Sequence, residues 1–218
     1  MAGTAGSDPP KPDTPLLIAC ALGIERFALR GRRGEPAGPV TVLRTGMGPA
    51  NAERAVRGAL GEDRLRGSAV VASGFCAGLT PGMSPGDLVV AEETRDARGA
   101  TPCAGTELLF EALSRALPGH RVHTGPLTGS DHVVRGQERA ELRTTGAVGV
   151  DMESAATLRT ALEAGPRPVA AVRVVVDAPE HELVRIGTVR GGISAFRVLR
   201  AVLPVFYEWH RSLLLPRR

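Results

Sequence analysis

The sequence has little of three residue types, and each shortage excludes a class of protein. Only three cysteines occur among its 218 residues, Cys20, Cys76 and Cys103. They show no CxxC or Cys/His spacing, which argues against a disulfide framework and a zinc site. Lysine occurs only at Lys11, so the formal net charge of +4 comes from arginines scattered among acids. Because aromatic residues make up only 3% of the chain and no basic run is interleaved with them, we expect no nucleic-acid partner.

Long apolar runs are absent as well. No stretch approaches the roughly 20 apolar residues that are needed to cross a bilayer. Residues 1–15 contain four prolines and no apolar signal segment. We therefore expect a flexible leader over residues 1–15, one domain over residues 16–215, and a cytoplasmic protein.

Short apolar runs alternate with segments of helical periodicity. The runs predict buried strands at 16–22, 40–43, 69–72, 88–91, 147–150 and 169–176. Helices are predicted over 25–30, 106–117, 137–144 and 153–164, from Asn51 as an N-cap, and from 193 onward with a break at Pro204. This alternation predicts a single three-layer α/β domain with a mixed, mainly parallel central sheet. The strand at 40–43 fits beside 16–22 in either direction.

Two carboxylates stand at strand ends, where ligands of α/β proteins bind. Asp177 ends the apolar run 169–176, and Glu153 stands between a strand and a helix. Position alone does not assign a function to either residue, because an aspartate also caps helices and a glutamate is favoured in a first helical turn.

Four segments, taken in order, carry a resemblance to a known family. They are Thr45-Gly46-Met47-Gly48, Ser73-Gly74-Phe75-Cys76-Ala77-Gly78, Val150-Asp151-Met152-Glu153-Ser154 and Arg173-Val174-Val175-Val176-Asp177. Together they resemble the nucleoside phosphorylase and nucleosidase superfamily, and within it the methylthioadenosine/adenosylhomocysteine nucleosidases. The resemblance spans residues 16 to 205 and implies a phosphorylase/hydrolase-like fold that cleaves the N-glycosidic bond of a purine nucleoside.

The resemblance implies two catalytic carboxylates. Negative charge builds on the purine as it leaves, so an acid must protonate the base. The resemblance gives this role to Asp177, and we expect its apolar neighbours in residues 174–176 to disfavour the charged carboxylate and keep a proton available. Glu25, near the end of the first strand, falls where the nucleosidases of this family hold the carboxylate that activates the attacking water.

The binding residues are likewise implied by the resemblance. Met152 is expected to pack under the ribose, and Glu153 to accept hydrogen bonds from its hydroxyls. The other expected contacts are Met47, Gly74, Phe75, Cys76, Ala77, His132 and Val150. No metal or organic cofactor is implied. The expected assembly is a homodimer that binds a small purine nucleoside.

The nucleophile remains open between water and phosphate as a co-substrate. A carboxylate at Glu25 would repel a phosphate dianion, and Ala72 stands where hexameric phosphorylases have a phosphate-binding arginine. Arg26, Arg30 and Arg44 provide an alternative source of positive charge.

Departures from the nucleosidase pattern bear on the substrate. Val176 replaces a serine that helps to read adenine, and residues 129–134 lack the phenylalanine that stacks on the base, a role left to His132. With the segment Cys76-Ala77-Gly78, these departures resemble the hopanoid-associated branch of the superfamily. That resemblance implies adenine release from adenosylhopane, giving ribosylhopane or its phosphate. Contact with the inner face of the membrane would suit a lipid substrate, and the arginines of the C-terminal segment could provide it. The favoured interpretation of that segment, however, is a core-packing helix with solvated arginines. The alternative function is that of a methylthioadenosine/adenosylhomocysteine nucleosidase of purine and methionine salvage.

Two other classes of protein fit part of the sequence. A dinucleotide-binding oxidoreductase needs a third glycine after Gly46 and Gly48, but Asn51 stands there and no acid ends the next strand. An inactive nucleoside-binding module with the same fold is the second alternative. The presence of both Glu25 and Asp177 argues against it.

Overall fold

The computed structural model describes residues 14–30, 39–178 and 188–214, so nearly all of the predicted leader lies outside the described residues. The strands are β1 (Leu16–Cys20), β2 (Val40–Arg44), β3 (Ala69–Gly78), β4 (Leu88–Asp96), β5 (Gly99–Pro102), β6 (Val122–Gly129), β7 (Gly149–Asp151) and β8 (Val169–Asp177). The α-helices are α1 (Gly23–Ala28), α2 (Pro49–Leu60), α3 (Thr106–Ala116), α4 (Gln137–Thr144), α5 (Ser154–Glu163), α6 (Thr188–Ala201) and α7 (Leu203–Leu214). A short 3₁₀ helix, η1 (Asp63–Leu65), follows α2.

The sheet is mixed and mainly parallel. β1 pairs in parallel with β2 and β3, β3 with β8, β4 with β6, and β6 with β7. Antiparallel pairs join β3 to β7 and β4 to β5 and β8. The strand at β2 therefore runs parallel to β1. Because β8 pairs with β3 and β4 while β7 pairs with β3 and β6, the central strands close into a ring.

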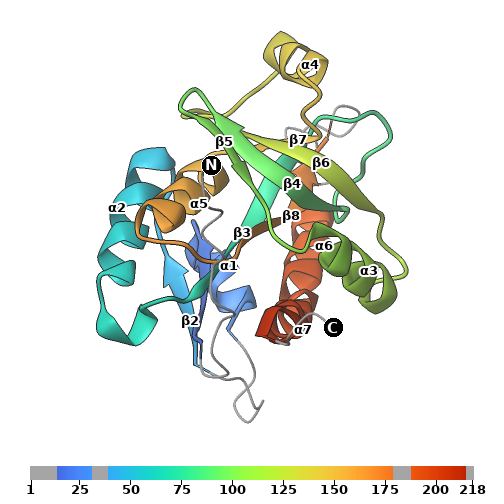
Figure 1. Cartoon of the computed structure of the whole chain (residues 1–218). Coiled ribbons are helices and arrows are strands. Elements are labelled where there is room, and N and C mark those ends of the chain that lie inside the picture. Colours follow the sequence, from blue (N-terminus) through green and yellow to red (C-terminus); the bar gives the residue numbers. More distant parts are fainter. Residues whose placement is uncertain (1–13, 31–38, 179–187, 215–218) are drawn as a thin grey trace, which may run out of the picture.

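Helices cover both faces of the sheet, as Figure 1 shows for α2 and α5 on one side and α3, α6 and α7 on the other. Alternate side chains of β1 feed two separate cores. Leu16 and Ile18 pack with α1, α3, α6 and α7, whereas Leu17 and Ala19 pack with α2 and α5. Full burial stabilises each large aliphatic side chain by about 1.5–3 kcal/mol. The predicted three-layer α/β fold is confirmed.

Two predicted helix boundaries were wrong. Helix α2 has Gly48 as its N-cap and begins at Pro49, not after an N-cap at Asn51. Gly48 has a φ of 89°, which favours glycine, and a proline in the first turn loses no helical hydrogen bond. The C-terminal break falls between Ala201 and Leu203, so that Pro204 lies in the first turn of α7. Among the described helices, none is both long and apolar enough to cross a membrane.

Three strand predictions also needed correction. The strand predicted at 69–72 is longer than expected, because the segment from Ser73 to Gly78 continues β3. Strands β5 and β6 were missed. The sequence of β6 is Val-His-Thr-Gly-Pro-Leu-Thr-Gly. Its internal glycine and proline interrupt the pattern of apolar residues that would indicate a strand. The long β3 matters for the site because its final residues reach past the ends of β1 and β2.

Candidate active site

A cavity of about 230 Å³ opens where β1, β3, β7 and β8 end. It brings together both predicted catalytic carboxylates, Glu25 and Asp177, although α1 and β8 are far apart in sequence. The predicted binding residues that line it are Met47, Phe75, Cys76, Ala77, His132, Val150, Met152 and Glu153. Gly74 is not among the lining residues. The cavity therefore gathers nearly the whole set that the sequence motifs indicated.

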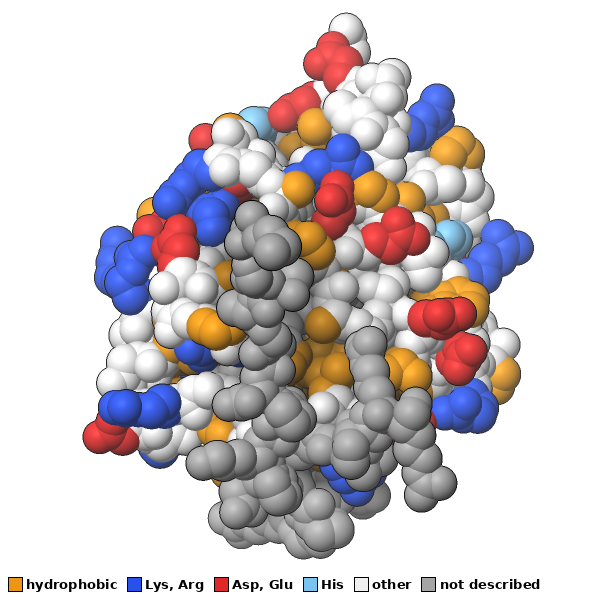
Figure 2. Space-filling model, viewed as in Figure 1, with side chains coloured by type: hydrophobic (Ala, Val, Ile, Leu, Met, Phe, Trp, Pro, Cys, Tyr) orange, Lys and Arg blue, Asp and Glu red, His pale blue; other side chains and the backbone are white. Residues whose placement is uncertain are grey.

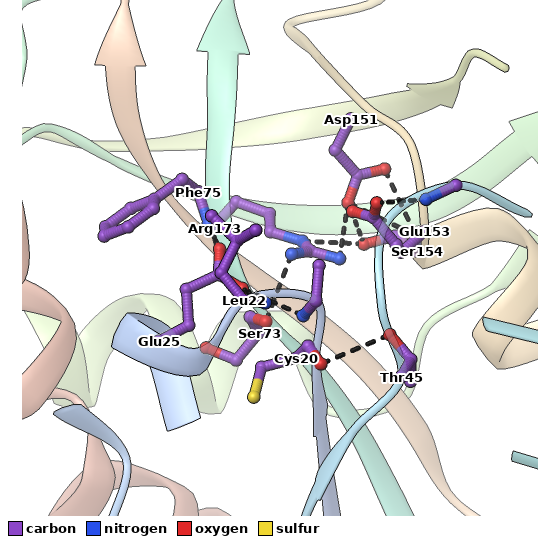
Figure 3. A network of polar contacts seen from close by, with 12 residues as sticks. Cys20, Leu22, Glu25, Thr45, Ser73, Phe75, Asp151, Glu153, Ser154 and Arg173 are labelled. Carbon is purple, nitrogen blue, oxygen red and sulfur yellow. Dashed lines mark hydrogen bonds and ion pairs between the residues drawn. The ribbon is translucent and has the colours of Figure 1, made fainter. Parts of the chain in front are cut away.

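The carboxylate of Glu25 fills a site made of backbone N–H groups. Its Oε2 accepts hydrogen bonds from the N–H groups of Ala21 and Leu22 at 2.9 and 2.7 Å, and its Oε1 accepts one from Phe75 at 2.8 Å. Figure 3 shows Glu25 turned toward Leu22 and Phe75. Three donors therefore hold the carboxylate in place. Because Leu22 is the N-cap of α1, Glu25 also caps its own helix.

Gly74 leaves the space that Glu25 occupies. A Cβ built on Gly74 would lie 2.5 Å from Glu25 Oε1 and 2.6 Å from Arg173 Nη1. Its φ of 141° is also one that other residues rarely adopt. Gly74 therefore contributes to the site by allowing these two side chains to approach the backbone.

Asp177 is buried, but its partner differs from the expected apolar surroundings. Arg139 from α4 forms a two-pronged ion pair with it, Nη1 donating to Oδ1 at 3.2 Å and Nη2 to Oδ2. Both side chains are buried. Besides the apolar neighbours expected from the sequence, Asp177 therefore has a buried cationic partner that the sequence did not indicate.

Glu153 is the N-cap of α5 and reaches across the cavity to the glycine loop before α2. Its Oε1 accepts a hydrogen bond from the N–H of Gly48 at 2.8 Å. Burial raises the pKa of Glu153 above its usual value, although nearby Arg173 opposes this rise. Met152 lies beside Glu153 among the residues that line the cavity.

A buried arginine links the strands beneath the cavity. Arg173 of β8 contacts Asp151 of β7 at 2.5 Å, donates to the hydroxyl of Ser154 at 2.9 Å and donates to the carbonyl of Ser73 at 3.1 Å. Asp151 in turn accepts a hydrogen bond from Ser154 Oγ at 2.6 Å. Figure 3 shows the side chain of Arg173 reaching toward Asp151 and Ser154. This network fixes the position from which Glu153 projects.

We expect Arg173→Met to destabilise the fold by about 3–5 kcal/mol, because it leaves the carboxylate of Asp151 buried without a counter-charge. Urea denaturation measures the change in the free energy of unfolding. The matched control is Arg66→Met, whose ion pair with Asp63 is exposed and should contribute less than about 1 kcal/mol. Equal losses in the two variants would contradict a structural role for the buried network. Adding Asp151→Asn to Arg173→Met should recover part of the loss.

The mouth of the cavity is apolar. Met47 and Val133 line it and are 54% and 55% exposed, and Phe75 lies on the same wall half-buried. His132 also lines the mouth, but its ring contacts two carboxylates, Asp131 at 2.6 Å and Glu138 at 2.9 Å. These hydrogen bonds, with Asp131 first, raise the pKa of His132.

Other candidate ligands lie off the cavity. Arg26, Arg30 and Arg44, considered as phosphate ligands, are exposed and none lines it. Burial raises the pKa of the Cys76 thiol, which does not suit a nucleophile. In the part of the chain that the structure describes, no three His, Cys, Asp or Glu side chains group as metal ligands.

Sequence reasoning missed Arg139 and did not assign roles to Asp151 and Arg173. Arg139 follows no pattern that separates it from the arginines near it, so only the fold reveals its partner. Arg173 did carry a signal, since a single arginine inside the apolar run 169–176 must be paired if that strand is buried.

The sequence and the fold both resemble those of known proteins. A family model described as the phosphorylase superfamily matches residues 24–204. A search of curated proteins gave no match. Among solved structures, the 5'-methylthioadenosine/S-adenosylhomocysteine nucleosidase of Neisseria meningitidis, in complex with methylthio-immucillin-A, has a TM-score of 0.71 and 23% identity. The alignment covers 89% of this chain and 99% of that one.

Two further structures have the same fold at lower identity. The corresponding nucleosidase of S. pneumoniae has a TM-score of 0.69 and 18% identity, with 89% of this chain and 98% of that chain covered. The futalosine hydrolase of Helicobacter pylori has a TM-score of 0.71 and 13% identity, with 90% and 98% covered. At these identities the likeness concerns the fold.

Proposed function

The chain belongs to the phosphorylase superfamily, a family of N-glycosyl bond-cleaving enzymes, and from that premise we propose that it hydrolyses a purine nucleoside. The observation that carries the proposal is the single cavity that holds Glu25, Asp177 and Glu153 together. Cleavage of a nucleoside needs an acid for the departing base, a group that activates the nucleophile and a clamp for the ribose. These three carboxylates supply one group for each task.

Asp177 acts on the leaving purine. It protonates a ring nitrogen as the bond to the sugar lengthens, so that the base departs as a neutral molecule. In the structure its carboxyl group is paired with Arg139. The proposal therefore includes a step in which the entering purine separates Arg139 from Asp177, so that the carboxyl group faces the base.

The hydrogen bonds around Glu25 favour water over phosphate as the nucleophile. A phosphate dianion needs several backbone N–H groups or arginines, but the N–H groups of Ala21, Leu22 and Phe75 already donate to Glu25. A second anion beside this carboxylate would be repelled. Glu25 thus takes the place of phosphate and accepts the proton of the attacking water.

The substrate that we propose is adenosylhopane, with ribosylhopane and adenine as products. Support comes from the apolar mouth formed by Met47, Phe75 and Val133, which offers an exit for a large apolar group on the 5' carbon. The second candidate is a nucleoside with a small 5' substituent, methylthioadenosine or adenosylhomocysteine. It is favoured by the nearly full-length structural likeness to nucleosidases of that name.

We expect adenine release from adenosylhopane with no dependence on phosphate. The measurement follows adenine by absorbance with adenosylhopane or methylthioadenosine, each with and without phosphate, and then determines the mass of the sugar product. Release from methylthioadenosine alone would assign the chain to salvage metabolism instead. A sugar phosphate as product would contradict the role given to Glu25. Binding of both nucleosides without release would indicate an inactive binding module.

A further inference from the structure

Helix α1 carries an apolar patch on the outside of the cavity wall. Ile24 and Phe27 are 54% and 66% exposed, although Glu25 between them is buried. Phe27 stacks on Phe196 of α6, with ring centroids 6.1 Å apart and planes inclined by 21°. Single exposed apolar residues are common on protein surfaces. Here Ile24 and Phe27 lie within one turn of α1, and Phe27 also contacts Phe196 of α6. The three side chains together form an apolar patch that water solvates poorly.

Exposed arginines surround this patch. Arg26 lies on α1, Arg30 lies just beyond the end of α1, and Arg200 stands one turn from Phe196 on α6. Arg44 at the end of β2 is adjacent, since a Cβ built on Gly23 would lie 3.7 Å from its Nη1. We call this surface the α1 face. It consists of the three apolar residues Ile24, Phe27 and Phe196 and the five arginines Arg26, Arg30, Arg44, Arg197 and Arg200. The only acid in α1, β2 or α6 is the buried Glu25.

Several arginines on other faces of the molecule have acidic partners. Arg57 and Arg98 both contact Glu53, and Arg115 contacts Glu208. Over the face seen in Figure 2, acidic and arginine side chains lie side by side. Among the described residues, none of the five arginines of the α1 face has an ion pair. Their charge is therefore available to an anionic partner.

We propose that the α1 face docks on an anionic lipid bilayer. Apolar side chains ringed by arginines match the interface of such a bilayer, where the apolar groups enter the acyl boundary and the guanidinium groups contact phosphates. The proposal rests on the proposed function, because a lipid-linked nucleoside resides in a membrane. Docking through α1 would place the cavity wall that carries Leu22 and Glu25 next to the bilayer surface.

The test is sedimentation of the full chain with phosphatidylcholine vesicles, with and without phosphatidylglycerol, and no nucleoside. We expect binding only to the anionic vesicles and weaker binding as salt is raised. Arg30→Gln, Arg197→Gln and Arg200→Gln together should weaken partition by about 100-fold, at about fivefold for each arginine. Ile24→Ser with Phe27→Ser should also abolish detectable sedimentation.

Matched controls use the same substitutions on other faces. Leu108→Ser with Phe110→Ser changes two exposed apolar residues of α3, and Arg54→Gln, Arg64→Gln and Arg66→Gln remove three exposed charges; both should bind as the wild type does. Equal loss in the controls, or no wild-type sedimentation, would overturn the proposal. So would a change of oligomeric state in the α1 variants, measured by analytical ultracentrifugation without vesicles, because the face would then join two copies of the chain.

The test of the docking surface can be distinguished from the test of the proposed substrate. Vesicle binding without adenine release from adenosylhopane would support the docking surface and contradict the substrate. Release from detergent-dispersed adenosylhopane without vesicle binding would support the substrate and contradict the docking surface. The α1 variants should keep wild-type turnover of the dispersed substrate, because none of their positions lines the cavity.

Discussion

Asp177→Asn lowers kcat by about 10²–10⁴-fold while nucleoside binding survives, if Asp177 is the general acid. Asparagine has nearly the same shape but no acidic proton to give to the departing base. Isothermal titration with a substrate analogue measures binding, and adenine release measures turnover. Because the substitution also leaves Arg139 buried without its partner, thermal unfolding must show that the variant is folded. Turnover within a few-fold of wild type would remove Asp177 from the mechanism.

Two controls separate the acid from its surroundings. Asp63→Asn changes an exposed aspartate on η1 and should leave turnover unchanged. Arg139→Gln keeps Asp177 but removes its ion-pair partner, so it tests whether the pair itself is needed for turnover. If Asp177 alone acts on the departing base, this variant should lose less turnover than Asp177→Asn. An equal or larger loss would assign the effect to the ion pair rather than to the acid.

Glu25→Ala is expected to reduce turnover by about 10²–10⁴-fold, because no group remains to accept the proton of the attacking water. The same change frees the N–H groups of Ala21, Leu22 and Phe75 for another anion. Added formate should therefore restore part of the rate, since its carboxylate fits the vacated donors. Glu62→Ala, at an exposed position, serves as the control and should neither lose activity nor respond to formate.

Phosphate distinguishes the nucleophile in the same variant. In the wild type we expect free sugar as the product at all phosphate concentrations. In Glu25→Ala, phosphate should now enter and yield some sugar phosphate, detected by mass. Phosphate-dependent cleavage by the wild-type chain would show that Glu25 does not exclude the anion.

Much of the fold could be predicted from sequence because its signals are local. Strands such as β1 and β8 are apolar runs bounded by polar residues, and α4 has the predicted bounds. The failures are also local in origin. Strand β6 contains Gly125 and Pro126, which usually indicate loops, and the tertiary pairing with β4 and β7 overrides that preference.

The residues that line the cavity could be predicted for a different reason. Ordered motifs, rather than periodicity, indicated Glu25, Glu153 and Asp177, and the fold brings them to one cavity. What these side chains contact was not predictable, because ion pairs such as Arg139 with Asp177 join segments whose proximity depends on the whole sheet. A carboxylate's charge state depends on those contacts, so the sequence located the reactive groups more reliably than it described their chemistry.

The close approach at Gly74 gives a criterion that can be applied to other chains with this backbone. A side chain at position 74 would press on the carboxylate of Glu25, since its Cβ would lie 2.5 Å from Oε1. In a chain with serine or a larger residue at 74, the glutamate at position 25 must therefore shift away from the N–H group of Phe75. A single change at position 74 would thus disturb the carboxylate without altering Glu25 itself.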